Sequence, residues 1–232
     1  MPRALAIETS GRVGSIAVVD DGRVVREEQF PHGLQHAAQI IPIIDQLTKA
    51  QGWSPRDVDE LYVSVGPGSF TGLRIGVTLA KTMALATGVK LVAVPTVRVL
   101  VENAPAEARH VIIVLDAKRE QIFTARFERT ADGWTEREPA KLDSLAAMFA
   151  RAPRPVHLLG EGLPHHEKFV PRDDPSIVTT PPESWRARAA AVATIGYPLA
   201  RAGHVADPFT LTPIYIRRPE AEEKYDAAKA GR

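Results

Sequence analysis

The chain has 232 residues, no cysteine, and 29 basic against 28 acidic side chains, for a formal net charge of +1. This balance argues against unaided tight binding to nucleic acid, and the absence of cysteine excludes disulfides and thiolate metal sites. No apolar stretch is long enough for a secretory signal or a membrane span, so we expect a cytoplasmic protein.

The first part of the chain predicts an antiparallel meander followed by a helix. Short apolar segments separated by glycine-containing turns indicate three strands, at residues 4–9, 13–19 and 23–30. Glu8 falls at the end of the first strand, where a carboxylate can face a cleft. An apolar pattern of helical period then predicts a helix over residues 34–52, with Pro42 as an internal kink.

Residues 61–88 have the form of a buried strand, a glycine turn and a long helix, and the rest of the chain is organised around them. Gly66-Pro67-Gly68 ends the strand, and Ser69 or Thr71 can cap the helix. Small residues recur at every fourth position of this helix, so another backbone can approach it closely. They are Gly72, Gly76, Ala80, Ala84 and Gly88. Apolar side chains cover most of the remaining surface, which predicts burial on more than one side and a partner protein.

The glycine turn does not match the common phosphate-binding loops. A P-loop needs Gly-Lys-Ser/Thr at the helix start, where this chain has Gly72-Leu-Arg74. The dinucleotide fingerprint needs an acidic residue after the next strand, and residues 91–96 contain none. We therefore interpret the turn as structural, with a phosphate contact as the less favoured alternative.

The second half of the chain repeats the opening order of elements. A helix over 96–103 and a charged segment at 104–109 lead to a strand over 111–116 that ends in Asp116, then to a tight turn and a second strand over 122–127. Asp116 thus matches Glu8. Beyond it, a helix around 144–150, a strand at 156–159 and a helix over about 183–195 surround a proline-rich stretch that leaves little room for further helices.

This order predicts an α/β fold of the two-lobed actin-like ATPase class (ASKHA, RNase H-like) with a degenerate second lobe. We expect an N-terminal lobe at 1–103 that carries the dimerisation helices, a smaller lobe at 104–217, and a charged, flexible tail at 218–232.

Two pairs of histidines could suggest a metal site. His32 and His36 are four residues apart, but His32 falls before the predicted helix and no third ligand is evident. His165 and His166 lie in the proline-rich stretch. We interpret all four as surface or capping side chains and expect no metal and no cofactor.

Five segments together resemble one known family. They are Leu5-Ala-Ile-Glu-Thr-Ser10, His36-Ala-Ala-Gln-Ile-Ile-Pro42, Gly66-Pro-Gly-Ser-Phe-Thr-Gly-Leu-Arg-Ile-Gly76, Asp116-Ala-Lys-Arg-Glu120 and Pro213-Ile-Tyr-Ile-Arg217. In this order they resemble the bacterial TsaB (YeaZ) family, a shortened paralogue of the TsaD/Kae1 enzyme. Members of the family commonly have aspartate at the position of Glu8, which further weakens a metal–phosphate role for this residue.

The resemblance implies a non-catalytic, dimerising subunit of the complex that places threonylcarbamoyl on the adenosine beside the anticodon of tRNA. It implies a heterodimer with a TsaD-like catalytic paralogue, a TsaE-like P-loop ATPase subunit, a homodimer when alone, and only indirect contact with tRNA. The paralogue's His-x-x-x-His metal motif aligns with Thr96 and Leu100, which cannot hold a metal. This also argues against the group's old glycoprotease label.

As a scaffold, the protein would pair its two long helices with the same helices of a second copy or of the paralogue, across about 800 Å² per partner. We expect Ile44→Asp or Ala80→Arg to abolish both pairings. The expected interface comprises apolar and small residues of the two helices, namely Ile40, Ile41, Ile44, Leu47, Leu73, Gly76, Val77, Ala80 and Ala84.

An enzyme of the actin-like group is the alternative. It would be an ATP-dependent phosphotransferase or hydrolase in which Glu8 and Asp116 hold Mg²⁺ across a cleft. We favour a structural role for both acids, in which each carboxylate caps a turn. Lys118-Arg119 and Arg217-Arg218 could contact tRNA phosphates in a complex, although such pairs are usually solvated surface charges.

Overall fold

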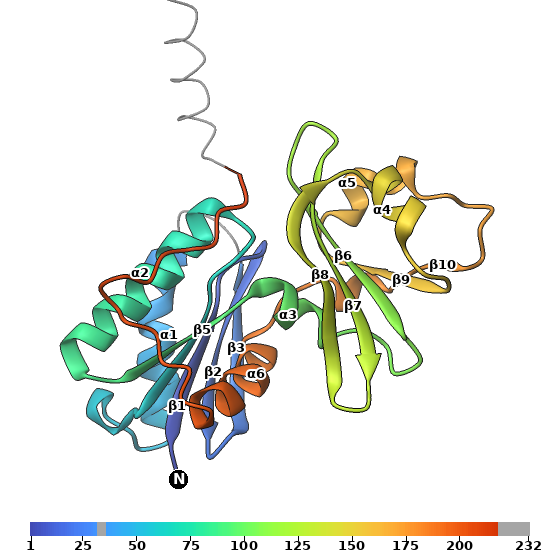
Figure 1. Cartoon of the computed structure of the whole chain (residues 1–232). Coiled ribbons are helices and arrows are strands. Elements are labelled where there is room, and N and C mark those ends of the chain that lie inside the picture. Colours follow the sequence, from blue (N-terminus) through green and yellow to red (C-terminus); the bar gives the residue numbers. More distant parts are fainter. Residues whose placement is uncertain (32–35, 218–232) are drawn as a thin grey trace, which may run out of the picture.

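The computed structural model describes residues 1–31 and 36–217. It consists of two lobes, each built on a five-stranded mixed sheet, which lie side by side (Figure 1). The predicted tail at 218–232 and His32 lie outside the described residues, as do the side chains of residues 31–37.

The first sheet has the strand order β3-β2-β1-β4-β5. The first three strands form the predicted antiparallel meander, and β4 and β5 continue the sheet in parallel with β1. Each strand matches a predicted apolar segment to within one or two residues. Their bounds are β1 Arg3–Glu8, β2 Val13–Asp20, β3 Arg23–Pro31, β4 Glu60–Ser64 and β5 Lys90–Val94.

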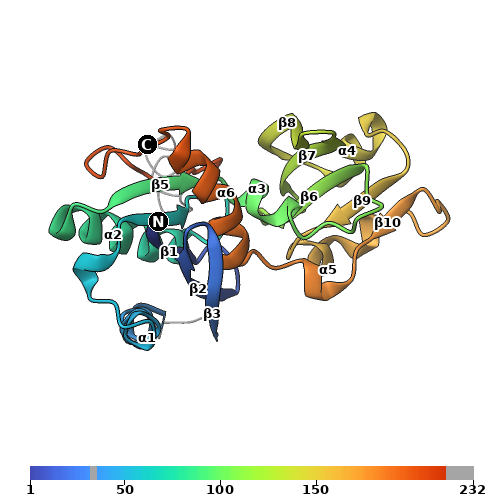
Figure 2. The same ribbon diagram turned by 90° about the horizontal axis from the view of Figure 1, so that it is seen from below.

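Helices cover both faces of this sheet (Figure 2). On the outer face lie α1 (His36–Ala50), which contains Pro42, and α2 (Phe70–Thr87), which begins at the predicted cap Ser69. On the inner face, toward the second lobe, lie α3 (Thr96–Val101) and α6 (Ala189–Arg201). A short 3₁₀ turn, η1 (Pro55–Asp57), precedes β4.

The second sheet repeats the first, because its order β10-β9-β6-β7-β8 places the strands in the same relative sequence. Its strands are β6 His110–Asp116, β7 Ile122–Thr130, β8 Gly133–Asp143, β9 Val156–Leu159 and β10 Ile177–Thr179. The helices are short, namely α4 Leu145–Arg151, α5 Leu163–His166, η2 Glu167–Phe169 and η3 Pro182–Ser184. The repeat confirms the actin-like α/β class with a reduced second lobe.

Apart from short helical turns such as α5, three larger elements differ from the sequence-based expectations. Strands β8 and β10 were not predicted, since β8 carries charged residues along an exposed edge and β10 has only three residues within the proline-rich stretch. Helix α6 begins at Ala189 rather than near residue 183, where the chain forms η3 instead. Moreover, α6 packs on the first sheet although it follows the second, so the proposed division at residue 104 applies to the sheets alone.

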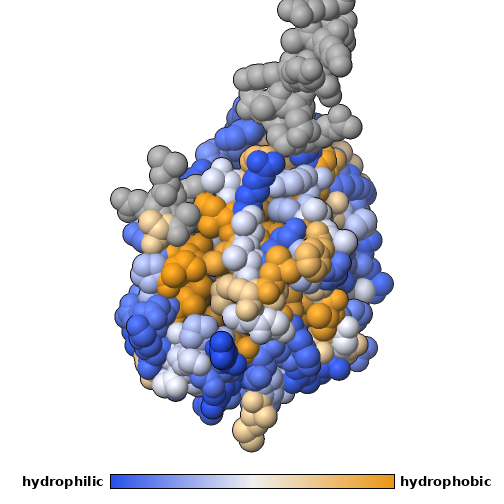
Figure 3. Space-filling model, turned by 90° about the vertical axis from the view of Figure 1, so that its left-hand side faces the viewer, coloured by the Kyte–Doolittle hydropathy of each residue, from blue (hydrophilic) through white to orange (hydrophobic). Residues whose placement is uncertain are grey.

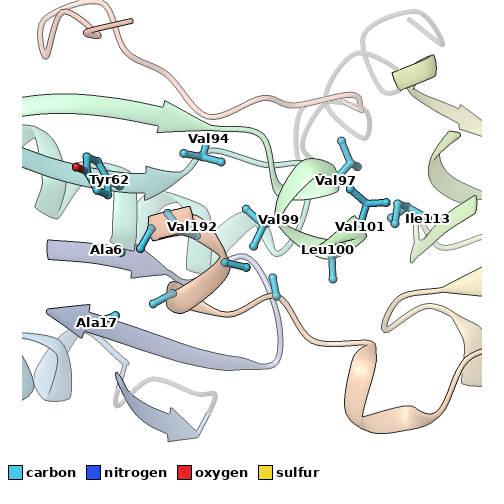
Figure 4. Packing of buried hydrophobic residues seen from close by; sticks show 14 of the residues in the cluster. Ala6, Ala17, Tyr62, Val94, Val97, Val99, Leu100, Val101, Ile113 and Val192 are labelled. Carbon is cyan, nitrogen blue, oxygen red and sulfur yellow. The ribbon is translucent and has the colours of Figure 1, made fainter. Parts of the chain in front are cut away.

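Besides a smaller core between the second sheet and helices α4 and α5, two larger apolar cores follow from this arrangement. One fills the space between the first sheet and helices α1 and α2. The other is shared by both lobes, because α3, α6 and the inner faces of both sheets contribute to it (Figure 4). In that view Tyr62 and Val94 of the first sheet, Val192 of α6, Val101 of α3 and Ile113 of β6 lie along one continuous apolar layer. None of the helices in the described part of the chain is long and apolar enough to cross a bilayer.

Candidate functional site

A cleft of about 790 Å³ lies between the lobes, at the carboxyl ends of the central strands. Turns from both lobes line it: residues 10–12 after β1, 67–70 after β4, 115–119 after β6, and Glu161 after β9. The C-terminal segment 214–217 forms a further wall. In an open α/β sheet this edge is where ligands commonly bind.

Glycines let the two turns of the first lobe pack against each other. A β-carbon on Gly68 would lie 2.5 Å from the carbonyl oxygen of Ser10, and one on Gly72 would collide with the carbonyl oxygen of Thr9. A β-carbon on Gly76 would collide with the Thr9 hydroxyl. The backbone that approaches the glycine side of α2 therefore belongs to the same chain.

Glycines also allow close packing between the turns of the second lobe. A β-carbon on Gly162 would lie 2.6 Å from the backbone nitrogen of Asp116, and one on Gly160 would meet the carbonyl oxygen of Val114. In both lobes, then, a glycine turn after the fourth strand of the repeat packs on the end of its first strand. Gly160-Glu-Gly162 thus occupies the place that Gly66-Pro-Gly68 has in the first lobe, a correspondence that the sequence analysis did not draw.

Glu8, the first predicted acid, is fully buried and is not among the residues that line the cleft. Its Oε1 accepts hydrogen bonds from the backbone N–H and the hydroxyl of Ser10, both at 2.5 Å. Among residues 1–31 and 36–217, none lies within hydrogen-bonding geometry of its Oε2. Burial raises the pKa of Glu8 despite the Ser10 hydrogen bonds, which favours the neutral acid.

Asp116, the second predicted acid, does line the cleft. Its Oδ1 accepts a hydrogen bond from the backbone N–H of Lys118 at 3.1 Å and lies 3.1 Å from Nε2 of the buried His166. Burial alone would raise the pKa of Asp116, but these two hydrogen bonds lower it below its ordinary value. The pKa shifts of the two matched acids thus have opposite signs.

Three polar contacts join the lobes across the cleft. The Arg12 backbone N–H donates to Oε2 of Glu161 at 2.9 Å, and the Arg12 guanidinium lies 2.5 Å from Nε2 of His165. On the other side, Arg217 donates to the carbonyl oxygen of Ala117 at 3.0 Å. Sequence reasoning missed Arg12 and Glu161, because neither carries a motif and only the fold brings them together.

The described residues do not form a metal cluster: within 1–31 and 36–217 no three His, Asp or Glu side chains are arranged to hold an ion. Glu8 and Asp116 do not face a common ion site, since Glu8 lies behind the Ser10 turn with its carboxyl buried. The residues described therefore do not fit the Mg²⁺ position that an actin-like ATPase would need.

The structure places most of the expected interface residues inside the monomer. Eight are buried within the chain, where most of them pack against the first sheet and Gly76 packs against Thr9. They are Ile40, Ile44, Leu47, Leu73, Gly76, Val77, Ala80 and Ala84. Ile41, at 54% exposure, faces solvent.

Other apolar side chains of α1 and α2 keep partial exposure instead. Leu85 is 52% exposed, and Ile43, Ile75, Leu79 and Met83 are half-buried at the margin of the outer core. Figure 3 looks onto this side of the molecule and shows apolar side chains gathered into patches between hydrophilic margins. We call these five residues together with Ile41 the helical face.

The sequence matches known proteins over most of its length. A family model described as tRNA N6-adenosine threonylcarbamoyltransferase, TsaD, matches residues 33–173. The TsaB protein of Bacillus subtilis is 28% identical over 227 residues, which cover 95% of this chain and 96% of that protein. The TsaB protein of Escherichia coli is 31% identical over 134 residues, 56% of this chain and 57% of that relative.

Solved structures show the same fold. YeaZ from Pseudomonas aeruginosa superposes with a TM-score of 0.77 at 22% identity and covers 93% of this chain and 100% of its own. The fold and the sequence matches agree. The chain belongs to the TsaD family of tRNA N6-adenosine threonylcarbamoyltransferases and, within it, to the TsaB (YeaZ) members.

Proposed function

We propose that this chain takes part in tRNA threonylcarbamoyladenosine biosynthesis as a non-catalytic subunit that supports a TsaD-like catalytic paralogue. The observation that carries the proposal is the similarity to TsaB proteins over nearly the whole chain. In this account the helical face binds the paralogue or, in its absence, a second copy, and a TsaE-like P-loop ATPase joins the same complex.

The positions that align with the paralogue's metal motif support a non-catalytic role. Thr96 is buried and its hydroxyl accepts a hydrogen bond from the backbone N–H of Gly66 at 3.1 Å. Leu100 is 1% exposed and packs in the core shared by the lobes. Both side chains therefore serve the packing of α3, and neither offers an atom that binds a metal well.

The helical face supports a docking role. Large apolar side chains of α1 and α2 are exposed at the surface, and exposed apolar patches commonly mark protein interaction sites. The same face covers the outer core, so a partner could bind there without disturbing the cleft turns. Ile44→Asp and Ala80→Arg would place a charge in the core, so they test folding rather than pairing.

The actin-like phosphotransferase receives less support. It needs two ionised acids that face one ion, whereas Glu8 is buried with a raised pKa and only Asp116 lines the cleft. Calorimetry with Mg-ATP on the isolated protein provides the check. Low-micromolar binding that disappears in Asp116→Asn would favour this alternative over the scaffold.

The direct test is reconstitution of tRNA modification with the purified paralogue and ATPase subunit. We expect modification to require this chain and to fall at least tenfold in Ile41→Asp and Leu85→Asp, which change exposed side chains of the helical face. Val178→Asp is the matched control, because Val178 is an exposed apolar residue of the second lobe, at 38% exposure. Full activity of both helical-face variants would show that partners bind elsewhere.

A further inference from the structure

Cationic side chains from three separate segments converge on the cleft between the lobes. Arg12 comes from the turn after β1, Lys118 and Arg119 from the turn after β6, and Arg217 from the C-terminal segment. Two carboxylates, Asp116 and Glu161, line the same cleft. The local surplus of two positive charges exceeds the net charge of +1 of the whole chain, so the cleft is a basic site on a nearly neutral protein.

The outward-facing charge at this cleft is mainly positive. Lys118 keeps 84% of its side chain exposed while its Nζ lies 3.6 Å from Oδ2 of Asp116, and Arg12 and Arg119 are also exposed. The acids are more enclosed and already accept hydrogen bonds: Asp116 is 22% exposed, and Glu161 accepts the Arg12 backbone N–H. An approaching anion would therefore meet ammonium and guanidinium groups first.

Aromatic side chains stand beside these cations. Phe70 and Tyr215 line the cleft with ring centroids 5.1 Å apart, and Tyr215 is 39% exposed. The Arg74 guanidinium lies 3.8 Å from the Phe70 ring centroid and donates to the Tyr215 hydroxyl at 3.1 Å, which fixes both rings. Cations beside exposed aromatic rings are typical of sites that bind unpaired nucleotides of RNA, because bases stack on the rings while phosphates bind the cations.

We propose that this cleft binds a segment of RNA directly, with Arg12, Lys118 and Arg119 on its phosphates and Tyr215 stacked on a base. The inference rests on the proposed function, since the RNA it would bind is the tRNA substrate of the complex. It differs from a role in which this chain contacts tRNA only through its partner. An acidic peptide would use the cations but would leave the aromatic rings without a function.

Fluorescence anisotropy of the full chain with an unmodified tRNA transcript, repeated over a series of salt concentrations, tests this site. The double variant Lys118→Asn/Arg119→Asn keeps residues that tolerate the left-handed backbone there, with φ of 64° and 53°. We expect its affinity to fall at least tenfold and the slope of log K against log salt to decrease by about 1.5, as for two lost phosphate contacts. Arg26→Asn/Arg172→Asn removes two charges elsewhere and is the matched control.

Tyr215→Leu separates stacking from charge. We expect it to weaken tRNA binding about fivefold or more without a change in the salt slope. The proposal is overturned if the cleft variants bind tRNA with the affinity and slope of the control. Displacement of tRNA by low-micromolar ATP would also overturn it, since the cleft would then be a mononucleotide site.

The modification assay distinguishes this inference from the proposed function. If wild-type chain does not stimulate the paralogue, the proposed function fails. If wild-type chain stimulates it, but the cleft variants stimulate and bind tRNA equally well, only the RNA site fails.

Discussion

The two lobes share one strand order but differ in the helices that cover their sheets. In the first lobe, α1 has 15 residues and α2 has 18, whereas in the second lobe α4 has 7 and α5 has 4. The glycine turns that shape the cleft are present in both. The repeat therefore keeps the strands and the cleft, and the first lobe alone keeps the long helices whose outer side we propose as the partner-binding surface.

The lobes also differ in what stabilises their periphery. The outer surface of the first lobe is apolar along the helical face, while the second lobe carries an ion-pair cluster on β7, β8 and α4. In that cluster Glu138 accepts hydrogen bonds from Arg126 and Arg151, both at less than 3 Å. Exposed apolar side chains favour binding to another protein, whereas paired charges remain favourable at a surface in contact with water.

The largest effect that we predict concerns Gly72, on the side of α2 that packs on the end of β1. Helix propensity alone predicts that Gly72→Ala stabilises α2 by about 1 kcal/mol. Because the new methyl group would collide with the Thr9 carbonyl oxygen, we expect a loss of about 3 kcal/mol in the free energy of unfolding instead. Urea denaturation measures the difference.

Gly11→Ala is the control for that variant. Its new methyl group would lie 3.0 Å from the far end of the flexible Glu161 side chain, so we expect a change below about 1 kcal/mol. Equal stability of Gly72→Ala and wild type would show that the turns are not packed as described.

The second prediction concerns the ion-pair cluster of the second lobe. Burial alone would raise the pKa of Glu138, but hydrogen bonds from Arg151, Arg126 and Lys141 lower it to about 2. This stabilisation is present above pH 4.5 and is lost as the pH falls toward 2. We expect Glu138→Gln to cost about 2 kcal/mol at neutral pH and little at acid pH, with Glu136→Gln as the neighbouring control. An equal loss in both variants would contradict this.

The third prediction concerns Glu8, whose contribution to stability changes with pH in the opposite direction to that of Glu138. Because its folded-state pKa is raised, its contribution to stability is complete below pH 4.5 and is lost as the pH rises through the folded pKa. We expect Glu8→Gln to stabilise the protein by about 1 kcal/mol at neutral pH and to have no such effect near pH 4. Thermal unfolding at both pH values tests this, and destabilisation at neutral pH would mean that the carboxylate is ionised and paired.

The smallest effect concerns two buried histidines of the second lobe. Burial lowers the pKa of His110 and of His157, so their contribution is present above pH 6.5 and is lost as the pH falls through the folded pKa values. We expect His157→Asn to flatten the loss of stability between about pH 7 and about pH 5.5 by less than about 1 kcal/mol. An unchanged pH profile would show that His157 is accessible to protons in the folded state.

Much of the fold could be predicted from the sequence because its elements are local. The meander, the segment from β4 to β5, and the match of Asp116 with Glu8 all follow from short apolar runs and their turns. Strand β8 could not, since its charged residues pair mainly with side chains of β7 and α4 and leave no apolar alternation. The position of α6 on the first sheet depends on the core that both lobes share, which no local pattern encodes.

At the candidate site, too, contacts between residues distant in the sequence could not be predicted from local patterns. The glycine stripe of α2 correctly predicted a close backbone approach, but the sequence could not show that Thr9 of the same chain makes it. Periodicity marks which positions are apolar, and only the tertiary structure shows that Ala80 faces inward while Ile41 faces solvent. For the same reason Arg12 and Glu161, which are distant in sequence, were not recognised as neighbours.

Hydroxyl-radical footprinting of the chain with and without its TsaD-like paralogue tests the central claim most directly. We predict that Ile41, Met83 and Leu85 of the helical face become protected in the complex, while Trp134 and Phe169 of the second lobe keep their reactivity. Protection confined to the second lobe, with the helical face unchanged, would contradict the account.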